Sequence, residues 1–410
     1  MVEERNVSTR YFRATPDMRA RYGTHIDRYF AFLSQGDPLA DAVVAAFAAM
    51  PAGRGRRMLD TALDHGIGAV PNAPAALHAL FAQLDNIPFW VDWHELDTGG
   101  AAFLQSGLLG VLVIALNSLP VSYSSPAGNK ALVSSGKLVQ RAARRLGETG
   151  RCVYLTSLPG GLRRFSDGFK VTVKVRLMHA QVRRLLWQSG RWNATLWGAP
   201  INQCFMSATN LLLSVNLLDG MRRFGLHFSA AQRHGLMQLW RYSAYLSGVH
   251  AELLHATEQE ARRFLEMVFG LDGPPDEDAR ALVHALMDVA HQLGLGRREW
   301  LQQMFYGISY AQIGRERARR LGYPQTPWRF LVPTARPFVR VADLLRPYIP
   351  GAQRLLQTLG VAGWRLAIDR TLAGPAPTFP FPQTLARAPS VAQAQRGGPS
   401  DDAAVLRVSQ

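Results

Sequence analysis

The chain has 410 residues, of which 48% are hydrophobic and 19% charged, and its formal net charge is +16. This length and composition allow a large buried core, in one big domain or two ordinary ones. With only Cys152 and Cys204, the chain has neither a disulfide framework nor a cysteine-based metal site. The basic residues, 42 of them arginine, are scattered along the chain. This scattered distribution favours the binding of small anionic groups, such as lipid headgroups or cofactor carboxylates, over the binding of nucleic acid.

The first segment, residues 1–25, is acidic and then basic, and we expect it to be loose. It contains no apolar stretch of the kind found in secretory signals, so a cytoplasmic location is expected. Peripheral attachment to a membrane is left open by the sequence.

Apolar residues recur at helical spacing through most of the chain, without an alternation of strands and helices. The pattern predicts an all-α fold with one large helical domain over residues 26–372, followed by a disordered tail rich in Pro, Ala and Ser at 373–410. A short β-like piece, "CVYLTSL", occupies 152–158. The predicted helices are 38–50, 74–84, 101–118, 131–147, 168–188, 203–218, 230–247, 258–269, 276–294, 298–320 and 352–371.

Two uncharged stretches, 99–129 and 192–218, are about long enough to cross a bilayer. Both contain several polar side chains, among them Gln105 and Asn117. Helices that are buried on all sides of a large helical domain have this composition. We therefore interpret the two stretches as internal helices.

His179 lies in an apolar stripe of the predicted helix 168–188. Val175, His179, Val182 and Leu186 follow one another at steps of four, three and four, so they share one face. Such a histidine is either a core residue satisfied by a neighbour or a ligand for something that is not protein. Upstream, "RRLGETG" (144–150) is typical of a helix that ends near Gly147.

The order of five sequence elements adds to this reading. They are "RLGET" (145–149), "VRLMHAQVR" (175–183), "WGAPINQ" (197–203), "LLDGMRRFGLHFS" (217–229) and "QLWRYSAYLSGV" (238–249). In this order they resemble the MpaB-type and rubber oxygenase catalytic-domain family, which includes the latex-clearing proteins. The likeness extends from about residue 40 to residue 340.

The resemblance implies a haem-b-dependent oxygenase whose all-α core is similar to a globin fold with added helices. The family's iron-binding histidine matches His179, and its Arg-x-x-x-Thr element matches Arg145 and Thr149. Rubber-cleaving members have a lysine where this chain has Glu148. That difference and the lack of an export signal both argue against polyisoprene as substrate. In these two respects the chain resembles the intracellular MpaB-like branch of the family.

On this reading Val175 and Val182 would form one wall of an apolar haem slot. Arg176 and Arg183, one turn to either side of His179, are expected to reach outward to the haem propionates.

Across the haem, Arg145, Glu148 and Thr149 would hydrogen-bond to oxygen or move a proton, with Glu148 as general base or transient sixth ligand. The expected partners are O2 and a hydrophobic, isoprenoid or unsaturated small molecule. Two alternatives remain: a non-catalytic haem or lipid-binding helical protein, and a helical structural protein without a cofactor.

Overall fold

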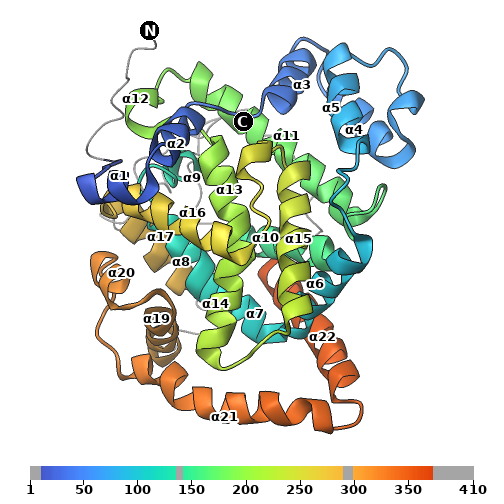
Figure 1. Cartoon of the computed structure of the whole chain (residues 1–410). Coiled ribbons are helices and arrows are strands. Elements are labelled where there is room, and N and C mark those ends of the chain that lie inside the picture. Colours follow the sequence, from blue (N-terminus) through green and yellow to red (C-terminus); the bar gives the residue numbers. More distant parts are fainter. Residues whose placement is uncertain (1–10, 135–141, 290–298, 373–410) are drawn as a thin grey trace, which may run out of the picture.

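The computed structural model describes residues 11–134, 142–289 and 299–372, which form helices joined by short loops (Figure 1). The helices of the first part are α1 (Pro16–Tyr22), α2 (His25–Leu33), α3 (Pro38–Ala48), α4 (Arg54–His65), α5 (Ala75–Asp85), α6 (Trp93–Gln105), α7 (Gly107–Val113), α8 (Leu119–Tyr123) and α9 (Lys130–Ser134). The middle part contains α10 (Ala142–Ser157), α11 (Asp167–Gln188), α12 (Ala194–Trp197), α13 (Gln203–Leu213), α14 (Val215–Phe224), α15 (Ala230–Leu246), α16 (Glu258–Leu271) and α17 (Glu277–Met287). The last part contains α19 (Glu299–Ile313), α20 (Arg315–Arg320), α21 (Leu331–Leu345) and α22 (Ala352–Leu372).

Short turns connect some of these helices. The 3-10 turns are η1 (Ile67–Ala69), η3 (Ala251–Leu253), η4 (Pro327–Phe330) and η5 (Arg346–Tyr348), and η2 (Ile114–Ser118) is a π-helical turn. Within the described ranges, strand-like pairing is limited to one isolated bridge between Phe12 and Asp272. The prediction of an all-α fold is confirmed.

Helix starts follow the capping residues of the sequence. Ser229 begins α15 with a capping box, in which its hydroxyl accepts from the Gln232 amide and the Gln232 side chain accepts from the Ser229 amide. Thr257 and Glu260 repeat this arrangement at α16. Asp37 caps α3, directly before a proline at the first helical position. These caps explain why the starts of the three helices lie close to the predicted ones.

The core is built where α6 crosses α15 at a pair of glycines. A Cβ on Gly99 would lie 2.1 Å from the carbonyl carbon of Gly235, so only glycine permits this approach. The last described helix, α22, is also part of the core. Its Trp364 is 2% exposed and stacks on Phe103 of α6, with ring centroids 5.0 Å apart. The C-terminal helix is therefore integral to the fold.

The predicted helix 101–118 is wrong as a single element. The chain bends by 90° between α6 and α7, and α7 then continues through η2 into α8. Over the described residues, no single helix is long and apolar enough to cross a bilayer. Among these residues, the bent pair of α6 with α7 and its continuation has that length and apolar composition only when the two parts are counted together. Its side chains include the buried Phe103, Val113 and Leu116, as the interpretation of the uncharged stretch as internal helix predicted.

Two other predicted helices are broken. The predicted helix 203–218 is interrupted at Ser214, where the backbone leaves helical geometry between α13 and α14. The predicted helix 298–320 is interrupted at Gly314, whose φ of +86° ends α19 before α20 begins. Part of the predicted helix 276–294 and part of 131–147 lie outside the described residues.

The β-like reading of 152–158 and the helix end at Gly147 are both wrong. Helix α10 runs without interruption from Ala142 to Ser157. Val153 and Tyr154 are 2% and 7% exposed, and tertiary burial overrides their local β preference. Gly147 lies inside the helix and does not end it. Glycine suits this position because α22 packs closely there, and a Cβ would lie 2.6 Å from the Thr371 hydroxyl oxygen.

Candidate functional site

The helix that carries His179 is α11, which has 22 residues. Ser166 caps it by accepting a hydrogen bond from the Phe169 amide at 3.4 Å, and Asp167 places a negative charge in the first turn. The predicted helix 168–188 is confirmed to within one residue at its start.

His179 lies on a partly buried strip of α11. The helix face beside it is fully packed, with Val173 and Leu177 at 0% exposure. Val175, His179 and Val182 are each of intermediate exposure. The imidazole is thus placed among apolar side chains at the edge of the core and not in its centre.

Arg176 is buried against α3 instead of pointing outward. Its Nε and Nη2 donate to the two carboxylate oxygens of Asp37, at 2.6 and 3.1 Å. Its Nη1 donates to the Gln83 side chain at 2.6 Å and to the Leu246 carbonyl at 3.1 Å. Because every nitrogen of this guanidinium is engaged and the residue is 2% exposed, the expectation that Arg176 reaches outward is wrong.

Arg183 is held in the same way one turn further along α3. Its Nε donates to Asp41 at 2.8 Å and its Nη1 to the Ile201 carbonyl at 3.1 Å, while its side chain is 2% exposed. Burial raises the pKa of the Asp41 carboxyl, and the Arg183 guanidinium partly offsets this. The predicted outward reach of Arg183 is therefore also wrong. Both arginines fasten α11 to α3.

Arg145, Glu148 and Thr149 lie within one turn of α10, at spacings that put them on one face. Thr149 is exposed. Glu148 accepts a hydrogen bond from Nε of Arg144 at 3.1 Å and is 30% exposed. The side chain of Arg145 lies outside the described residues.

Helices α10 and α11 pack against each other. They are joined by a tight connection in which Gly161 and Gly168 approach the backbone of Leu155. Glu148 lies nine residues before the end of α10 and His179 twelve residues after the start of α11. At a rise of about 1.5 Å per residue these positions are roughly 14 and 18 Å from the connection, measured along the helix axes. Glu148 and His179 therefore lie at comparable distances from the connected ends of the two helices.

The other histidines that the structure describes do not gather into a metal site. No three His, Cys, Asp or Glu side chains in the described ranges are grouped as a metal site. His234 of α15 pairs with Glu95 at 3.1 Å and is half-exposed. His255 lies on the ring of Phe264, and burial lowers its pKa to about 4.

Sequence reasoning missed the acidic partners of α11. Asp37 and Asp41 lie 139 and 142 residues before the arginines they bind, and Gln83 comes from α5. A local signal was present in "DPLAD" (37–41), where an aspartate before a proline is a typical helix cap and a second follows one turn later. Nothing local indicated which basic residues they would meet.

Comparison with known proteins identifies the family. The family described as ER-bound oxygenase mpaB/B′/rubber oxygenase, catalytic domain, matches residues 93–344. The chain belongs to this family. It is therefore an oxygenase, as the resemblance implied.

Two individual relatives agree with this assignment. The rubber oxygenase of Streptomyces sp. (strain K30) is 26% identical over 363 residues, which cover 85% of this chain and 87% of the relative. A solved structure of latex clearing protein in its closed state superposes with a TM-score of 0.65 at 23% identity, covering 82% of this chain and 90% of that one. The second likeness establishes a shared helical fold.

Proposed function

We propose that this oxygenase binds haem b through His179 and uses O2 to oxidise a hydrophobic, unsaturated or isoprenoid substrate. The observation that carries the proposal is the position of His179, a partly buried imidazole on an apolar strip of α11. A neutral imidazole in such surroundings suits an axial haem ligand. A bound haem would supply an iron centre that activates dioxygen.

The residues of α11 fit part of a haem site. His179 would hold the iron on one side, and Val175 and Val182 would cover the adjoining porphyrin face and exclude water. Arg176 is not assigned to the propionates, because all of its guanidinium nitrogens are engaged within the protein. Arg183 has a buried Nη2 without a hydrogen-bond partner, but its side chain is 2% exposed beside Asp41, and it is not assigned to the propionates either.

On α10, Glu148 and Thr149 are the groups that would hold or move a proton beside the substrate, and Arg145 shares their face of the helix. Rubber-cleaving members have lysine in place of Glu148, which favours a substrate other than polyisoprene. We also propose a cytoplasmic location.

An absorption spectrum tests the cofactor. The protein purified from iron-fed cells is expected to show the Soret band of haem, and His179→Ala is expected to lose it while keeping its helical circular dichroism. His234→Ala is the matched control, because His234 pairs with Glu95 at the surface. A His179→Ala variant that retains haem would show that the ligand is misassigned, and colourless wild-type protein that does not take up hemin would exclude the cofactor.

Oxygen consumption tests the reaction. The haem-loaded protein is expected to consume O2 when short isoprenoid alkenes are added. A loaded protein that consumes none with any such compound would favour a non-catalytic haem or lipid binder.

A further inference from the structure

Helix α21 carries its apolar residues on the side that faces solvent. Phe338, Val341 and Leu345 follow one another at steps of three and four, so they form one stripe, and they are 77%, 55% and 53% exposed. In a helix of a water-soluble domain this stripe normally packs on the core. Helix α21 lies along the lower edge of the molecule (Figure 1). The exposures of its stripe show that the stripe faces solvent there.

The opposite side of α21 is held by charge. Asp343 is 9% exposed and accepts hydrogen bonds from the His227 amide at 3.1 Å and from Arg340 at 3.3 Å. Arg346 approaches its other oxygen to 3.5 Å. Turning the helix over would expose the buried Asp343 carboxylate and break these contacts, so the contacts of Asp343 fix the outward orientation of the apolar stripe.

The apolar surface continues beyond α21. Tyr348 of η5 is 82% exposed, and Leu355 and Leu359 of α22 are 59% and 56% exposed. We define the C-terminal apolar face as Phe338, Val341, Leu345, Tyr348, Leu355 and Leu359. Large exposed apolar side chains that follow one another along one segment of a chain, here residues 338–359, indicate an interaction site.

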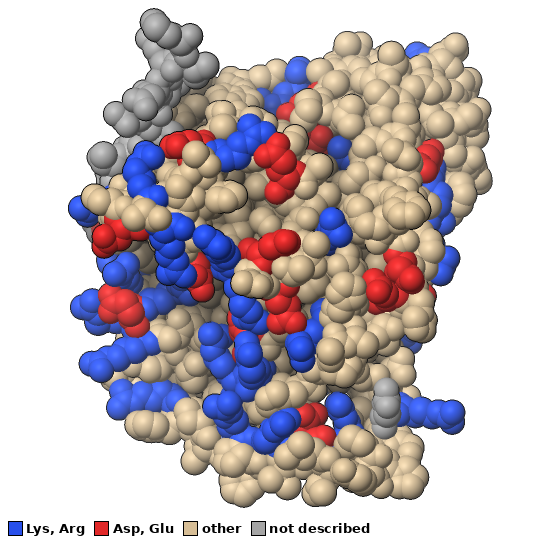
Figure 2. Space-filling model, in the orientation of Figure 1, with Lys and Arg blue, Asp and Glu red and all other residues tan. Residues whose placement is uncertain are grey.

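The segment that bears this face is strongly basic. Residues 327–372 contain seven arginines and no lysine, against two aspartates, and one of these, Asp343, is the buried one. Figure 2 shows basic side chains gathered above the uncharged lower edge of the molecule. Apolar side chains surrounded by arginines are typical of surfaces that lie in the headgroup region of anionic membranes.

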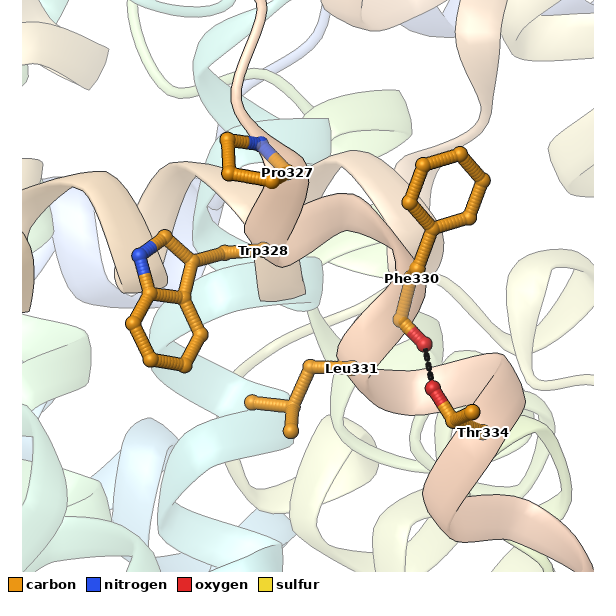
Figure 3. A pocket seen from close by; sticks show the side chains of 5 residues that line it. All are labelled: Pro327, Trp328, Phe330, Leu331 and Thr334. Carbon is orange, nitrogen blue, oxygen red and sulfur yellow. Dashed lines mark hydrogen bonds between the residues drawn. The ribbon is translucent and has the colours of Figure 1, made fainter.

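Aromatic side chains border the face at the start of α21. Trp328, Phe330 and Leu331 line an open hollow at η4, in which Trp328 and Leu331 extend to one side of the chain and Phe330 to the other (Figure 3). Trp300 of α19 is 50% exposed and lies beside Trp328, with ring centroids 6.3 Å apart. Tryptophan is enriched at the boundary between lipid and water.

Other occupants match this surface less well. A second copy paired through the same face would place one arginine-rich rim against another, which is repulsive. The chain's own residues 373–410 hold three arginines and two aspartates, so they carry no net negative charge to offset the rim. An anionic bilayer offers both an apolar interior and negative headgroups.

We propose that the C-terminal apolar face docks this oxygenase on an anionic lipid membrane, with α21 and the start of α22 lying in the plane of the interface. Phe338, Leu345 and Leu355 enter the acyl region, while the arginines of residues 327–372 pair with lipid phosphates. The contact is peripheral, and it requires neither haem nor turnover.

Vesicle co-sedimentation of the full chain tests the proposal. The wild-type protein is expected to sediment with vesicles of phosphatidylcholine and phosphatidylglycerol and much less with phosphatidylcholine alone, and added salt should weaken the binding. The variant Phe338→Ser/Leu345→Ser is expected to lose at least about tenfold in partitioning, because two large apolar side chains no longer enter the lipid. Both positions are exposed, so an unchanged thermal midpoint confirms that the variant is folded.

Phe89→Ser is the matched control. Phe89 is fully exposed in the loop between α5 and α6, and its loss should leave vesicle binding unchanged. Arg336→Gln/Arg354→Gln should reduce binding to the anionic vesicles and leave the weak binding to neutral vesicles as it was.

Three results would overturn the proposal. The first is wild-type protein that stays in the supernatant with anionic vesicles. The second is a Phe338→Ser/Leu345→Ser variant that binds as well as the wild type. The third is a wild-type dimer, seen by light scattering, that this variant converts to a monomer while neither form binds vesicles.

Discussion

Arg176 of α11 donates two hydrogen bonds to Asp37 at the start of α3, although 139 residues separate the two in the chain. Both side chains are 2% exposed. Together with the Arg183–Asp41 pair, this contact sets the position of the helix that carries His179. The cations next to the candidate ligand thus serve to place it.

Replacing Arg176 by methionine should destabilise the protein by about 3–5 kcal/mol, because Asp37 would keep a buried charge without its partner. Urea unfolding at neutral pH measures the change. The control is Arg19→Met, whose exposed pair with Asp27 should be worth less than about 1 kcal/mol. Equal losses in the two variants would contradict the buried ion pair as a main anchor of α11.

Gly248→Ala should destabilise the same contact from the other side. Gly248 has a φ of +82°, and an added Cβ would lie 2.1 Å from a carboxylate oxygen of Asp37. The steric overlap adds to the cost of the left-handed backbone, so we expect a loss of more than about 2 kcal/mol.

Gly190→Ala provides the comparison, since it has a φ of +66° and no atom within 4 Å of the added Cβ. It should show only the conformational cost, about 1 kcal/mol. Thermal unfolding of both variants separates the two contributions, and a smaller effect at Gly248 than at Gly190 would refute the prediction.

Glu148→Gln should lower turnover while the haem spectrum stays as in the wild type, since the amide cannot accept a proton as the carboxylate does. A general base typically contributes about 10²- to 10⁴-fold. The rate of O2 consumption with an alkene substrate measures the effect. Glu266→Gln, which removes a surface partner of Arg21, should leave the rate unchanged. Unaltered turnover in Glu148→Gln would exclude its role as base.

Asp272 should give the protein a pH-dependent stability. Burial raises the pKa of its carboxyl from 3.8 to about 7, and Ser125 and Arg317 oppose this shift only in part. Between these two values the unfolded chain has released the proton that the folded chain retains. The folded state then binds more protons, so its stability falls as pH rises through this window, by at most about 1.4 kcal/mol per pH unit.

Asp272→Asn should remove that slope. Unfolding free energies of the wild type and the variant, measured at several pH values from about 4 to 8, give the contribution of Asp272 as their difference. A difference that stays constant across the window, or one that grows in favour of the wild type as pH rises, would show that the buried carboxyl does not retain its proton.

The sequence predicts most of the helices, because their caps and apolar periods are local. Ser229 with Gln232 locates the start of α15, and the stripe through His179 locates α11. Breaks inside apolar stretches are different. Ser214 is not a helix breaker by type, so its residue type does not predict that the chain leaves helical geometry there.

The candidate site is only partly predictable for the same reason. Helical spacing places Arg176 and Arg183 beside His179 but says nothing about the distance from there to Asp37 and Asp41. Likewise, Val153 and Tyr154 favour a strand locally, and it is burial among other helices that makes their segment helical. Helices with a local cap, such as α15 and α16, were predicted correctly, whereas periodicity alone missed the breaks at Ser214 and Gly314 and could not supply the distant partners of the arginines.

The close approach of α10 to α22 connects the C-terminal apolar face with the candidate site. Gly147 and Gly150, which flank Glu148 and Thr149, rest on the last two turns of α22, against Thr371 and Ile368. The first two turns of the same helix carry the exposed Leu355 and Leu359. A contact made by the outer end of α22 therefore acts on a helix whose other end packs directly behind the turn of α10 that carries Glu148 and Thr149.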